Sequence, residues 1–387
     1  MDRRPPLTAR PRRRAVVLLL ATALLVVSGC AFGAPDDVDQ GKPPNLPPPP
    51  TPSAGPEGSE AEVGVQVLAK HLEAPWGLTF LPDGSGMFTE RDSRRIFSIT
   101  TGGAVKEVQT IEAAYSRGEG GLMGIAASPK YATDKTLYLY YTTETDNRIA
   151  KLVLGSEPVP IVTGIPVSGI HNGGRIAFGP DGFLYAGTGD ASENGRSQDL
   201  KSLGGKILRM TPEGKPAPGN PFPNSLVWSY GHRNVQGLAW DDKKRLYATE
   251  FGQNRFDEVN LIQPGKNYGW PTVEGKSADK RYVSPLVTWS TEEASPSGAA
   301  IVGNVLVAAA LRGQRLWLVT LDGNGGVTGD NRAILQGQFG RLRHAAAAPD
   351  GTIWLLTSNR DGRGDPAPDD DRIIRLLPPD SGGVSKL

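Results

Sequence analysis

The sequence predicts an all-β fold, a six-bladed β-propeller built from four-stranded antiparallel sheets. Three observations support this prediction: short runs of β-branched, aromatic and aliphatic residues, turn signals about every 8–12 residues, and a turn–strand unit that returns along the chain. Glycine (49) and proline (33) make up about a fifth of the 387 residues, which is too much for a helical bundle. No stretch sustains a helical hydrophobic period over three turns.

Residues 1–29 are predicted to form a lipoprotein signal peptide. Six arginines precede an uninterrupted run of 13 small and apolar residues from Ala15 to Val27. A charged segment followed by a short hydrophobic run and small residues is typical of a secretory signal, and the run is too short to span a bilayer comfortably. The Val-Ser-Gly-Cys sequence that ends at Cys30 resembles a bacterial lipobox. We therefore expect cleavage before Cys30 and lipidation of this residue; an ordinary signal peptide with an incidental cysteine is the alternative.

Residues 30–60 are predicted to form a proline-rich, disordered tether. This stretch is dominated by proline and small polar residues, and it cannot bury enough apolar surface to fold. Cys30 is the only cysteine, so the exported domain contains no internal disulfide. We expect an exported protein, anchored to the outer face of the bacterial cell membrane through its N-terminal lipid only. Neither the Sec nor the Tat export route is favoured.

Residues 61–380 are predicted to form the propeller, and residues 381–387 a flexible tail. The repeated unit is a Pro-Asp-Gly turn followed by a strand rich in aromatic residues, with clear copies at Pro82, Pro180 and Pro349. Degenerate copies start at Ser128 and Trp240. Repeats about 45–60 residues apart are typical of propeller blades, and roughly 53 residues per blade favours six blades over seven. A pair of β-sandwiches fits less well, because the same unit returns along the whole domain.

The charge balance argues against a nucleic-acid partner. The formal net charge is +1, but the first 30 residues carry six arginines and one aspartate, so the remainder is slightly acidic. Nucleic-acid-binding domains usually carry a basic patch. We expect no nucleic-acid binding.

A histidine and a carboxylate are the first candidates for chemistry. His171 opens the glycine-rich stretch 171–175, and Asp190 closes a strand of the same predicted blade. A histidine that a carboxylate holds in one tautomer suits a general base. A single histidine in a glycine-rich loop is more often inert, so the pair needs further partners to indicate a site.

Three arginines and an asparagine form a second set of candidates. Arg233 and Asn234 stand at a predicted strand start, where a cation and an amide could hold an anionic cofactor or a developing oxyanion. Arg233 could instead pair with a carboxylate between blades. Arg341 and Arg343 are two residues apart and therefore share one face of a strand. If these side chains face the axial mouth, they would bind carboxylates or phosphates. If they face outward, they would be solvated. The sequence leaves both alternatives open.

Residues 250–258 combine carboxylates with a turn whose carbonyl groups could be exposed. Hard cations such as calcium take this mixture of oxygen ligands. The spacing is not that of an EF-hand, and the chain has no histidine and cysteine set for zinc. With four histidines in all, a transition-metal centre is not expected.

Four stretches, taken together and in order, resemble one known family. They are residues 118–124, 171–175, 231–237 and 267–271. The family is that of the soluble, pyrroloquinoline quinone (PQQ)-dependent glucose dehydrogenases and their aldose sugar (glucose/sorbosone) dehydrogenase relatives, which are six-bladed propellers. The resemblance runs from about Leu72 to Leu377.

The resemblance implies PQQ and calcium as cofactors and assigns the catalytic roles. It implies that His171 takes the hydroxyl proton at the anomeric carbon of the sugar while hydride passes to the quinone. Asp190 matches the carboxylate that orients the histidine. Glu119 falls where the family has a polar residue on the substrate side. Arg233 would stabilise the reduced oxygen of the cofactor, with Asn234 beside it.

The same resemblance implies the ligands of the cofactor and of calcium. Arg341 and Arg343 match the pair that grips the cofactor carboxylates, and Arg312 stands where relatives have a lysine with a similar task. The carbonyl groups of Gly252 and Gln253 would hold the calcium that binds the quinone. Glu258 and Tyr268 fall near a second, structural calcium site.

This sequence departs from the family pattern at several places. Gln253 replaces a proline, Arg312 replaces a lysine, and His344 replaces an aspartate. Glu293 falls where a small hydroxyl residue would contact the cofactor, and a buried glutamate there would repel a tricarboxylate. The departures leave His171, Asp190 and Arg233 in place.

The predicted function is that of a quinoprotein oxidoreductase that oxidises the anomeric hydroxyl group of aldose sugars to lactones and passes electrons to an unknown acceptor. The alternative is a non-catalytic extracellular propeller that binds a protein or glycan partner, which would not need His171, Asp190 and Arg233 together. A calcium-dependent hydrolase of the gluconolactonase type ranks last, because four side-chain ligands from different blades are not evident. Sugar preference and oligomeric state are not indicated.

Overall fold

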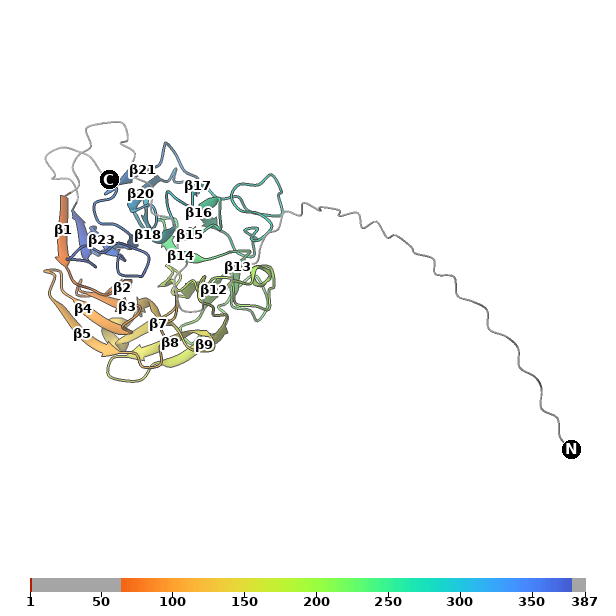
Figure 1. Cartoon of the computed structure of the whole chain (residues 1–387), viewed down its shortest axis with the longest axis horizontal. Helices are drawn as coiled ribbons and strands as arrows, with labels where there is room; N and C mark the ends of the chain where they lie inside the picture. The colour runs from red at the N-terminus through yellow and green to blue at the C-terminus, as the bar shows by residue number, and fades with distance from the viewer. Residues whose placement is uncertain (2–63, 378–387) are drawn as a thin grey trace. The chain divides into compact units, whose positions relative to one another are not determined.

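The computed structural model describes Met1 and residues 64–377. Within this range 24 strands form six four-stranded antiparallel sheets, which follow one another around the molecule from orange through green to blue in Figure 1. The prediction of a six-bladed propeller is confirmed, and the alternatives of seven blades and of paired sandwiches are wrong. Apart from Met1, the predicted signal peptide (1–29), the tether (30–60) and the tail (381–387) lie outside the described residues.

The first half of the ring contains three blades, whose strands follow the chain from the innermost to the outermost. Blade 1 contains β2 (Pro75–Phe80), β3 (Gly86–Glu90), β4 (Arg95–Ile99) and β5 (Val105–Thr110). Blade 2 contains β6 (Leu122–Ala127), β7 (Thr136–Thr142), β8 (Asn147–Val153) and β9 (Val159–Ile165). Blade 3 contains β10 (Ile176–Phe178), β11 (Leu184–Gly187), β12 (Lys206–Met210) and β13 (Val227–Tyr230).

The second half of the ring repeats this order from the inner to the outer strand. Blade 4 contains β14 (Val235–Trp240), β15 (Leu246–Glu250), β16 (Phe256–Ile262) and β17 (Val287–Ser290). Blade 5 contains β18 (Pro296–Val302), β19 (Val305–Ala310), β20 (Arg315–Thr320) and β21 (Arg332–Ile334). Blade 6 contains β22 (Leu342–Ala347), β23 (Ile353–Thr357), β24 (Ile373–Leu377) and β1 (Gly64–Ala69). Two single-turn helices, α1 (Tyr131–Asp134) and η1 (Asn194–Ser197), interrupt blades 2 and 3.

The Pro-Asp-Gly turns join the two innermost strands of blades 1, 3 and 6. Gly84, Gly182 and Gly351 occupy the same turn position, with φ of 83°, 79° and 81°. A residue with a Cβ atom rarely adopts this conformation, so glycine is required there. The sequence repeat is therefore one inner hairpin that recurs around the ring.

The ring is closed by strands from the two ends of the described chain. β1 pairs antiparallel with β24, and Gly64 lies opposite Leu377. Figure 1 shows β1, in orange, beside the blue strands of blade 6. Blade 6 therefore has four strands only because the N-terminal strand completes it.

The hydrophobic core is divided among the contacts between blades. Each of the six buried apolar clusters joins two successive sheets, and the cluster between blades 6 and 1 includes Leu68, Phe88 and Trp354. Each sheet thus buries both faces against its neighbours, which explains why strands such as β7 carry long apolar runs rather than an alternating pattern. The ring gains its stability from face-to-face packing of sheets.

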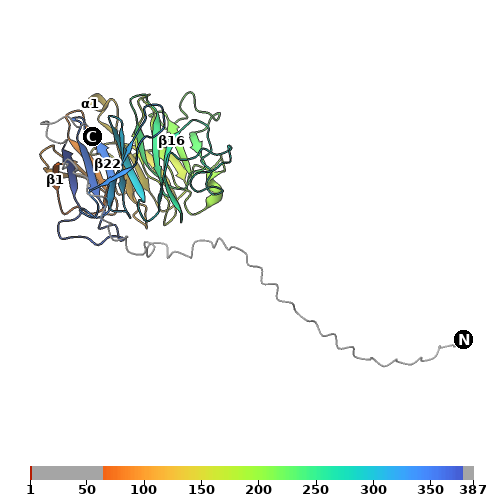
Figure 2. The same ribbon diagram turned by 90° about the horizontal axis from the view of Figure 1, so that it is seen from above.

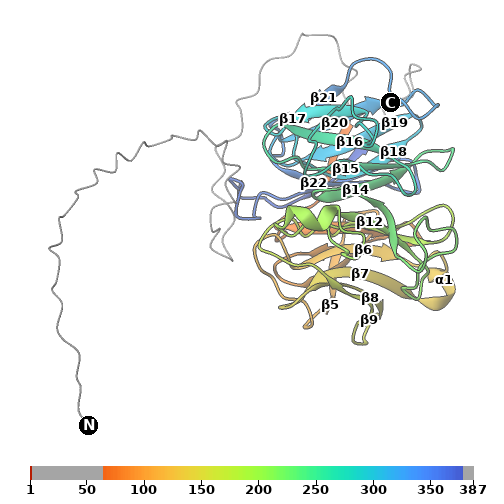
Figure 3. The same ribbon diagram turned by 90° about the vertical axis from the view of Figure 1, so that its right-hand side faces the viewer.

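The inner strands surround the axis of the ring. In Figure 3 the inner strands β14 and β22 lie in the middle, while the outer strands β9 and β21 lie at opposite edges. Figure 2 shows the strands running between the two faces of the ring. All six inner strands start at the same face, so residues that directly precede them gather around one mouth of the axis. Among the described residues, no helix has the length and apolar content needed to cross a membrane.

Candidate active site

A polar cavity of about 180 Å³ lies at the mouth where the inner strands start. Its lining includes Glu119, His171, Arg233, Ser295 and Arg341, which stand shortly before β6, β10, β14, β18 and β22. Five blades therefore contribute to one cavity from positions that are far apart in the sequence. Of the residues proposed from sequence, seven line this cavity: Glu119, His171, Arg233, Gly252, Gln253, Arg312 and Arg341.

His171 is held by hydrogen bonds at both its ring and its backbone. The ring Nδ1 atom lies 2.8 Å from Oδ1 of Asp190, whose side chain is fully buried. The Trp270 indole Nε1–H donates to the other carboxylate oxygen of Asp190 at 2.8 Å. The backbone N–H of His171 donates to Glu119 at 2.8 Å. This arrangement fixes the tautomer with the proton on Nδ1 and leaves Nε2 as a free base.

The glycines around His171 permit the close approach of two loops. A Cβ atom at Gly189 would lie 1.9 Å from the His171 carbonyl oxygen, and one at Gly173 would lie 2.5 Å from Thr188. His171 itself has φ of 57°, a left-handed conformation that is uncommon for a residue other than glycine. The glycine-rich sequence thus allows the histidine and its carboxylate to meet.

The protonation states of the pair suit a base. Burial and the positive charge of Arg233 lower the pKa of His171, although Asp190 acts in the opposite direction. Burial alone would raise the pKa of Asp190, but its hydrogen bond and charge interaction with His171 lower it overall. His171 is therefore neutral, and Asp190 ionised, at neutral pH.

Glu119 is ionised and paired within the cavity wall. Burial opposes its ionisation, but the charges of Arg363 and His171 lower the pKa of Glu119 to about 2. Its Oε1 atom accepts a hydrogen bond from Nη1 of Arg363 at 2.6 Å. Glu119 therefore ties a blade 6 loop to the segment that supports His171.

Arg341 and Arg343 share one acceptor, Asp361. Nη2 of Arg341 lies 3.0 Å, and Nη2 of Arg343 3.2 Å, from the same Asp361 oxygen. The two side chains therefore lie on one face and point inward. Burial raises the pKa of Asp361, but the two arginines hold it well below its usual range. Burial lowers the pKa of Arg343 to about 9. The Arg343 side chain donates a hydrogen bond to Gln236 and does not belong to the cavity lining.

Arg233 is a half-buried cation that lies over the Trp270 ring and forms no ion pair within the described part of the chain. Nη1 is 3.4 Å from the Phe251 carbonyl oxygen, and Nε has no hydrogen-bond partner within the described part of the chain. Burial lowers the pKa of Arg233, while Asp190 and Glu119 raise it. A positively charged donor is thus available beside His171.

The Gly252–Gln253 loop presents its carbonyl groups away from Glu274. One oxygen of Glu274 accepts the backbone N–H groups of Gln253 at 2.8 Å and Asn254 at 3.0 Å, and also those of the next two residues. In a trans peptide the C=O group points opposite to the N–H group that follows it. The Gly252 and Gln253 carbonyl groups must therefore point away from Glu274, and both residues line the cavity. A Cβ atom at Gly252 would lie 2.0 Å from the Phe256 carbonyl oxygen, so glycine is needed here.

Asp257 lies at the same side of the cavity. It accepts the backbone N–H groups of Gly252 and Ser295, and burial raises the pKa of Asp257 to about 7. Among the described residues, no group of three or more histidine, cysteine, aspartate or glutamate side chains is arranged for a metal. A cation at this wall would therefore depend on backbone carbonyl oxygens.

One expectation is wrong. Glu293 is exposed and accepts hydrogen bonds from Ser290, so it does not face the cavity. The hydroxyl residues Thr291 and Ser295 line the cavity in its place. Arg312, in contrast, lines the cavity, with its Nη2 atom 3.5 Å from Glu292 at the rim. The repulsive glutamate anticipated from the sequence is absent from this wall.

Three other candidates lie outside the cavity lining. The Asn234 amide oxygen accepts the Gly173 N–H at 2.9 Å, so this side chain supports the loop that carries His171. Glu258 is buried, and burial together with the nearby Glu250 raises its pKa to about 8. The Tyr268 hydroxyl group donates to the Leu261 carbonyl oxygen and accepts the Gln263 N–H, so it is held within blade 4.

Several residues of the site were not selected from the sequence. They are Asp257, Trp270, Glu274, Asp361 and Arg363. Trp270 lies in a stretch that resembles the family, and Asp257 lies in the predicted cation loop, so their motifs were visible although their roles were not. The charged, glycine-rich run of residues 360–365 was the available signal for Asp361 and Arg363.

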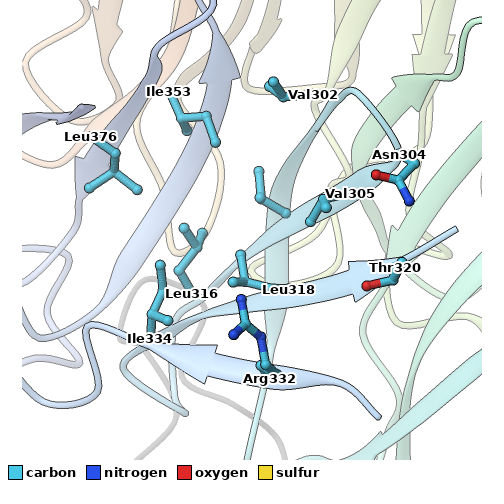
Figure 4. A pocket seen from close by; sticks show the side chains of 11 residues that line it. Val302, Asn304, Val305, Leu316, Leu318, Thr320, Arg332, Ile334, Ile353 and Leu376 are labelled. Carbon is cyan, nitrogen blue, oxygen red and sulfur yellow. The ribbon is translucent and has the colours of Figure 1, made fainter. Parts of the chain in front are cut away.

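An apolar cavity of about 190 Å³ lies between blades 5 and 6 (Figure 4). Leu316, Leu318, Ile353 and Leu376 contribute to its wall, and Arg332 is the one ionisable residue among the described residues of its lining.

Several known proteins are similar to this chain in sequence and in fold. Residues 72–375 match the glucose/sorbosone dehydrogenase family. The aldose sugar dehydrogenase YliI of Escherichia coli is 29% identical over 78% of this chain and 92% of its own length. The quinoprotein glucose dehydrogenase B of Acinetobacter calcoaceticus is 28% identical over 66% of this chain and 63% of its own length.

Among solved structures, the PQQ-bound aldose sugar dehydrogenase of Streptomyces coelicolor is similar to this chain. It has 51% sequence identity and a TM-score of 0.78, covering 82% of this chain and 98% of its own. The family match, the propeller fold and the cavity at the inner-strand mouth all indicate the same family. The chain therefore belongs to the glucose/sorbosone dehydrogenase family.

Proposed function

We propose that this protein is a PQQ- and calcium-dependent dehydrogenase that oxidises the anomeric hydroxyl group of aldose sugars to lactones. Membership of the family and the likeness to a PQQ-bound relative with 51% identity support the cofactor and the substrate class. The observation that carries the proposal is the buried His171–Asp190 pair, which opens into the same cavity as Arg233 and Arg341.

His171 is the general base of the proposed reaction. Its Nδ1–H donates to Asp190, and its Nε2 atom is free to accept the anomeric hydroxyl proton. Asp190 stabilises the imidazolium that forms, and the Trp270 N–H keeps this carboxylate ionised and oriented. PQQ, when bound, supplies the acceptor for the hydride lost from the anomeric carbon.

The charges of the cavity fit a polyanionic cofactor. Four arginines and only two carboxylates line it. Buried nitrogen atoms of Arg233, Arg312 and Arg363 have no hydrogen-bond partners among the residues that the structure describes. Unpartnered buried donors are costly, and a tricarboxylate would satisfy them with charge-assisted hydrogen bonds. The residues present therefore fit PQQ.

The wall formed by Gly252 and Gln253 fits a hard cation. The carbonyl groups of Gly252 and Gln253 are directed away from Glu274 at the cavity edge, and oxygen ligands of this kind suit calcium. The replacement of proline by Gln253 leaves the backbone carbonyl oxygen available. We assign these two residues to a cofactor-linked calcium ion, and the Glu258 and Tyr268 region to a second, structural one.

The proposal is tested by reconstitution. Purified protein, stripped with a chelator, is titrated with PQQ in the presence of calcium or magnesium, and binding is followed by absorbance and dye reduction by several aldoses. We expect calcium-dependent quinone binding and sugar-dependent dye reduction. Quinone binding without any sugar oxidation would instead favour a binding module.

We also propose that the protein is exported and anchored by a lipid on Cys30, with residues 30–60 as a tether. Mass spectrometry of the mature N-terminus and cell fractionation test this. We expect Cys30 to carry a lipid, and we expect the Cys30→Ser variant to be lost from the membrane fraction. An unmodified Cys30 in a membrane-free protein would contradict the proposal.

A further inference from the structure

A second cavity on the axis lies at the face opposite the candidate active site. Its volume is about 520 Å³, and it is lined by the inner strands of all six blades, mostly beyond their first residues. We call it the alanine cavity because alanines from β6, β10, β14, β18 and β22 form much of its wall. Among the described residues of its lining, Arg175 and His344 are the only ionisable ones.

Arg175 is a buried cation without a counter-ion. It is 4% exposed, its Nε–H donates to the Gln236 carbonyl oxygen at 2.7 Å, and its Nη2 atom has no hydrogen-bond partner in the described part of the chain. Its guanidinium carbon lies 4.2 Å from the centre of the Trp76 ring, which offsets part of the lost hydration. No ion pair of Arg175 with a carboxylate occurs among the described residues.

A second positive charge nearby makes the burial of the Arg175 charge more unfavourable. Burial and the nearby positive charge of Arg343 lower the pKa of Arg175 well below its usual value. A buried charge that lacks a partner of opposite charge is strongly destabilising. A negative charge in the alanine cavity would remove this imbalance.

His344 supplies a polar atom but no second charge. It is 6% exposed, and its Nδ1 atom also has no hydrogen-bond partner among residues 64–377. Burial and Arg175 hold the pKa of His344 well below its usual value, so the ring is neutral. The alanine cavity therefore offers one positive charge, surrounded by mostly apolar walls.

We infer that the alanine cavity binds a small monocarboxylate with a short apolar tail. The carboxylate forms an ion pair with Arg175, and the tail lies against the alanines of the inner strands. A single guanidinium balances one negative charge, so a dianion would carry an unpaired charge among apolar walls. The four arginines of the candidate active site, in contrast, suit a polyanion.

Hexanoate is the probe for this site. The quinone-free full chain is titrated with hexanoate by calorimetry, with acetate, chloride and hexanol as comparisons, and melting temperatures are recorded. We expect saturable binding of hexanoate, weaker binding of acetate and chloride, and none of hexanol. Binding of chloride or acetate as tight as that of hexanoate would contradict the role of the apolar tail. Binding of hexanol as tight as that of hexanoate would contradict the ion pair. If hexanoate does not bind at all, the site itself is contradicted.

Two variants locate the ion pair. Arg175→Met should weaken hexanoate binding about tenfold or more, because it removes the charge and keeps the bulk. Ala177 lines the same cavity two residues beyond Arg175, so the side chains share a face of the strand. Ala177→Glu should place a carboxylate near Arg175, weaken hexanoate binding, and preserve or raise the melting temperature.

Ala177→Gln is the matched control, with the same size and no charge. We expect it to bind hexanoate more tightly than Ala177→Glu does. Equal weakening by Glu and Gln, or unchanged binding by Arg175→Met, would overturn the inference. The Ala177 pair decides the question if Arg175→Met does not fold, and neither result depends on PQQ.

Discussion

His171 is held in place by two carboxylates that act on different atoms. Glu119 accepts its backbone N–H, and Asp190 accepts the ring Nδ1–H, so both the main chain and the imidazole are fixed. A left-handed residue other than glycine costs about 1–3 kcal/mol, which these contacts offset. The histidine is therefore oriented before any substrate arrives.

Replacing His171 by Gln should lower turnover by about 10²- to 10⁴-fold, the usual contribution of a general base. Binding of PQQ should change little, because the arginines and the Gly252–Gln253 loop remain. Dye-reduction kinetics and quinone titration measure the two effects separately. Parallel loss of turnover and of quinone affinity would contradict the assignment of His171 as the base.

Replacing Asp190 by Asn should move the acid limb of the pH profile of kcat/KM to lower pH. Asp190 raises the pKa of His171 against burial and Arg233, so removing its charge lowers that pKa further. Turnover at pH values above the limb should also fall, because an amide can hold the wrong histidine tautomer. A shift of the acid limb to higher pH would contradict this interpretation.

Among the loops, residues 252–256 depend on a residue distant in the sequence. A single Glu274 oxygen accepts four successive backbone N–H groups, at 2.8–3.1 Å. Because these N–H groups face Glu274, the carbonyl groups of Gly252 and Gln253 face the other way. Glu274 thus orients the loop for the proposed cation from outside the cavity lining.

Glu274→Ala should weaken calcium-dependent quinone binding by about tenfold or more, since supporting residues of metal sites commonly contribute this much. Glu274→Gln keeps one oxygen acceptor, so its calcium-dependent affinity for the quinone should lie between that of Glu274→Ala and that of the unsubstituted protein. Calcium titrations at fixed PQQ measure the effect. A normal calcium requirement in Glu274→Ala would show that the loop does not need this carboxylate.

For the whole molecule, closure of the ring depends on β1. This strand pairs with β24 and adds Leu68 and Ala69 to the cluster between blades 6 and 1. Without it, blade 6 would expose the edge of β24 and part of that cluster. Stability is therefore a property of the closed ring.

Deleting residues 64–69 should reduce the free energy of unfolding by several kcal/mol, on the order of 3, from lost apolar burial and hydrogen bonds. Deleting residues 31–60, the predicted tether, should leave it unchanged and serves as the control. Denaturant unfolding of both proteins measures the difference. Equal stability of the two deletions would mean that β1 does not close the ring.

Local patterns in the sequence predicted the inner hairpins of five blades, and the length of the domain predicted the sixth blade. The Pro-Asp-Gly turns at Gly84, Gly182 and Gly351 adopt nearly identical φ values, because turn chemistry depends on neighbouring residues. The same locality made His171, Asp190 and Arg233 recognisable as motifs. His171 and Arg233 meet at one cavity, with Asp190 behind His171, because each stands near the start of an inner strand or the end of the strand beside it.

Only the tertiary structure decided which other residues complete the site. Arg363 and Glu119 are 244 residues apart and lie 2.6 Å from each other, and Asp361 joins Arg341 to Arg343. Glu293 was expected inside but is exposed, because the direction of a loop side chain is not set by strand alternation. Turn and strand preferences act over a few residues, whereas ring closure brings distant loops together.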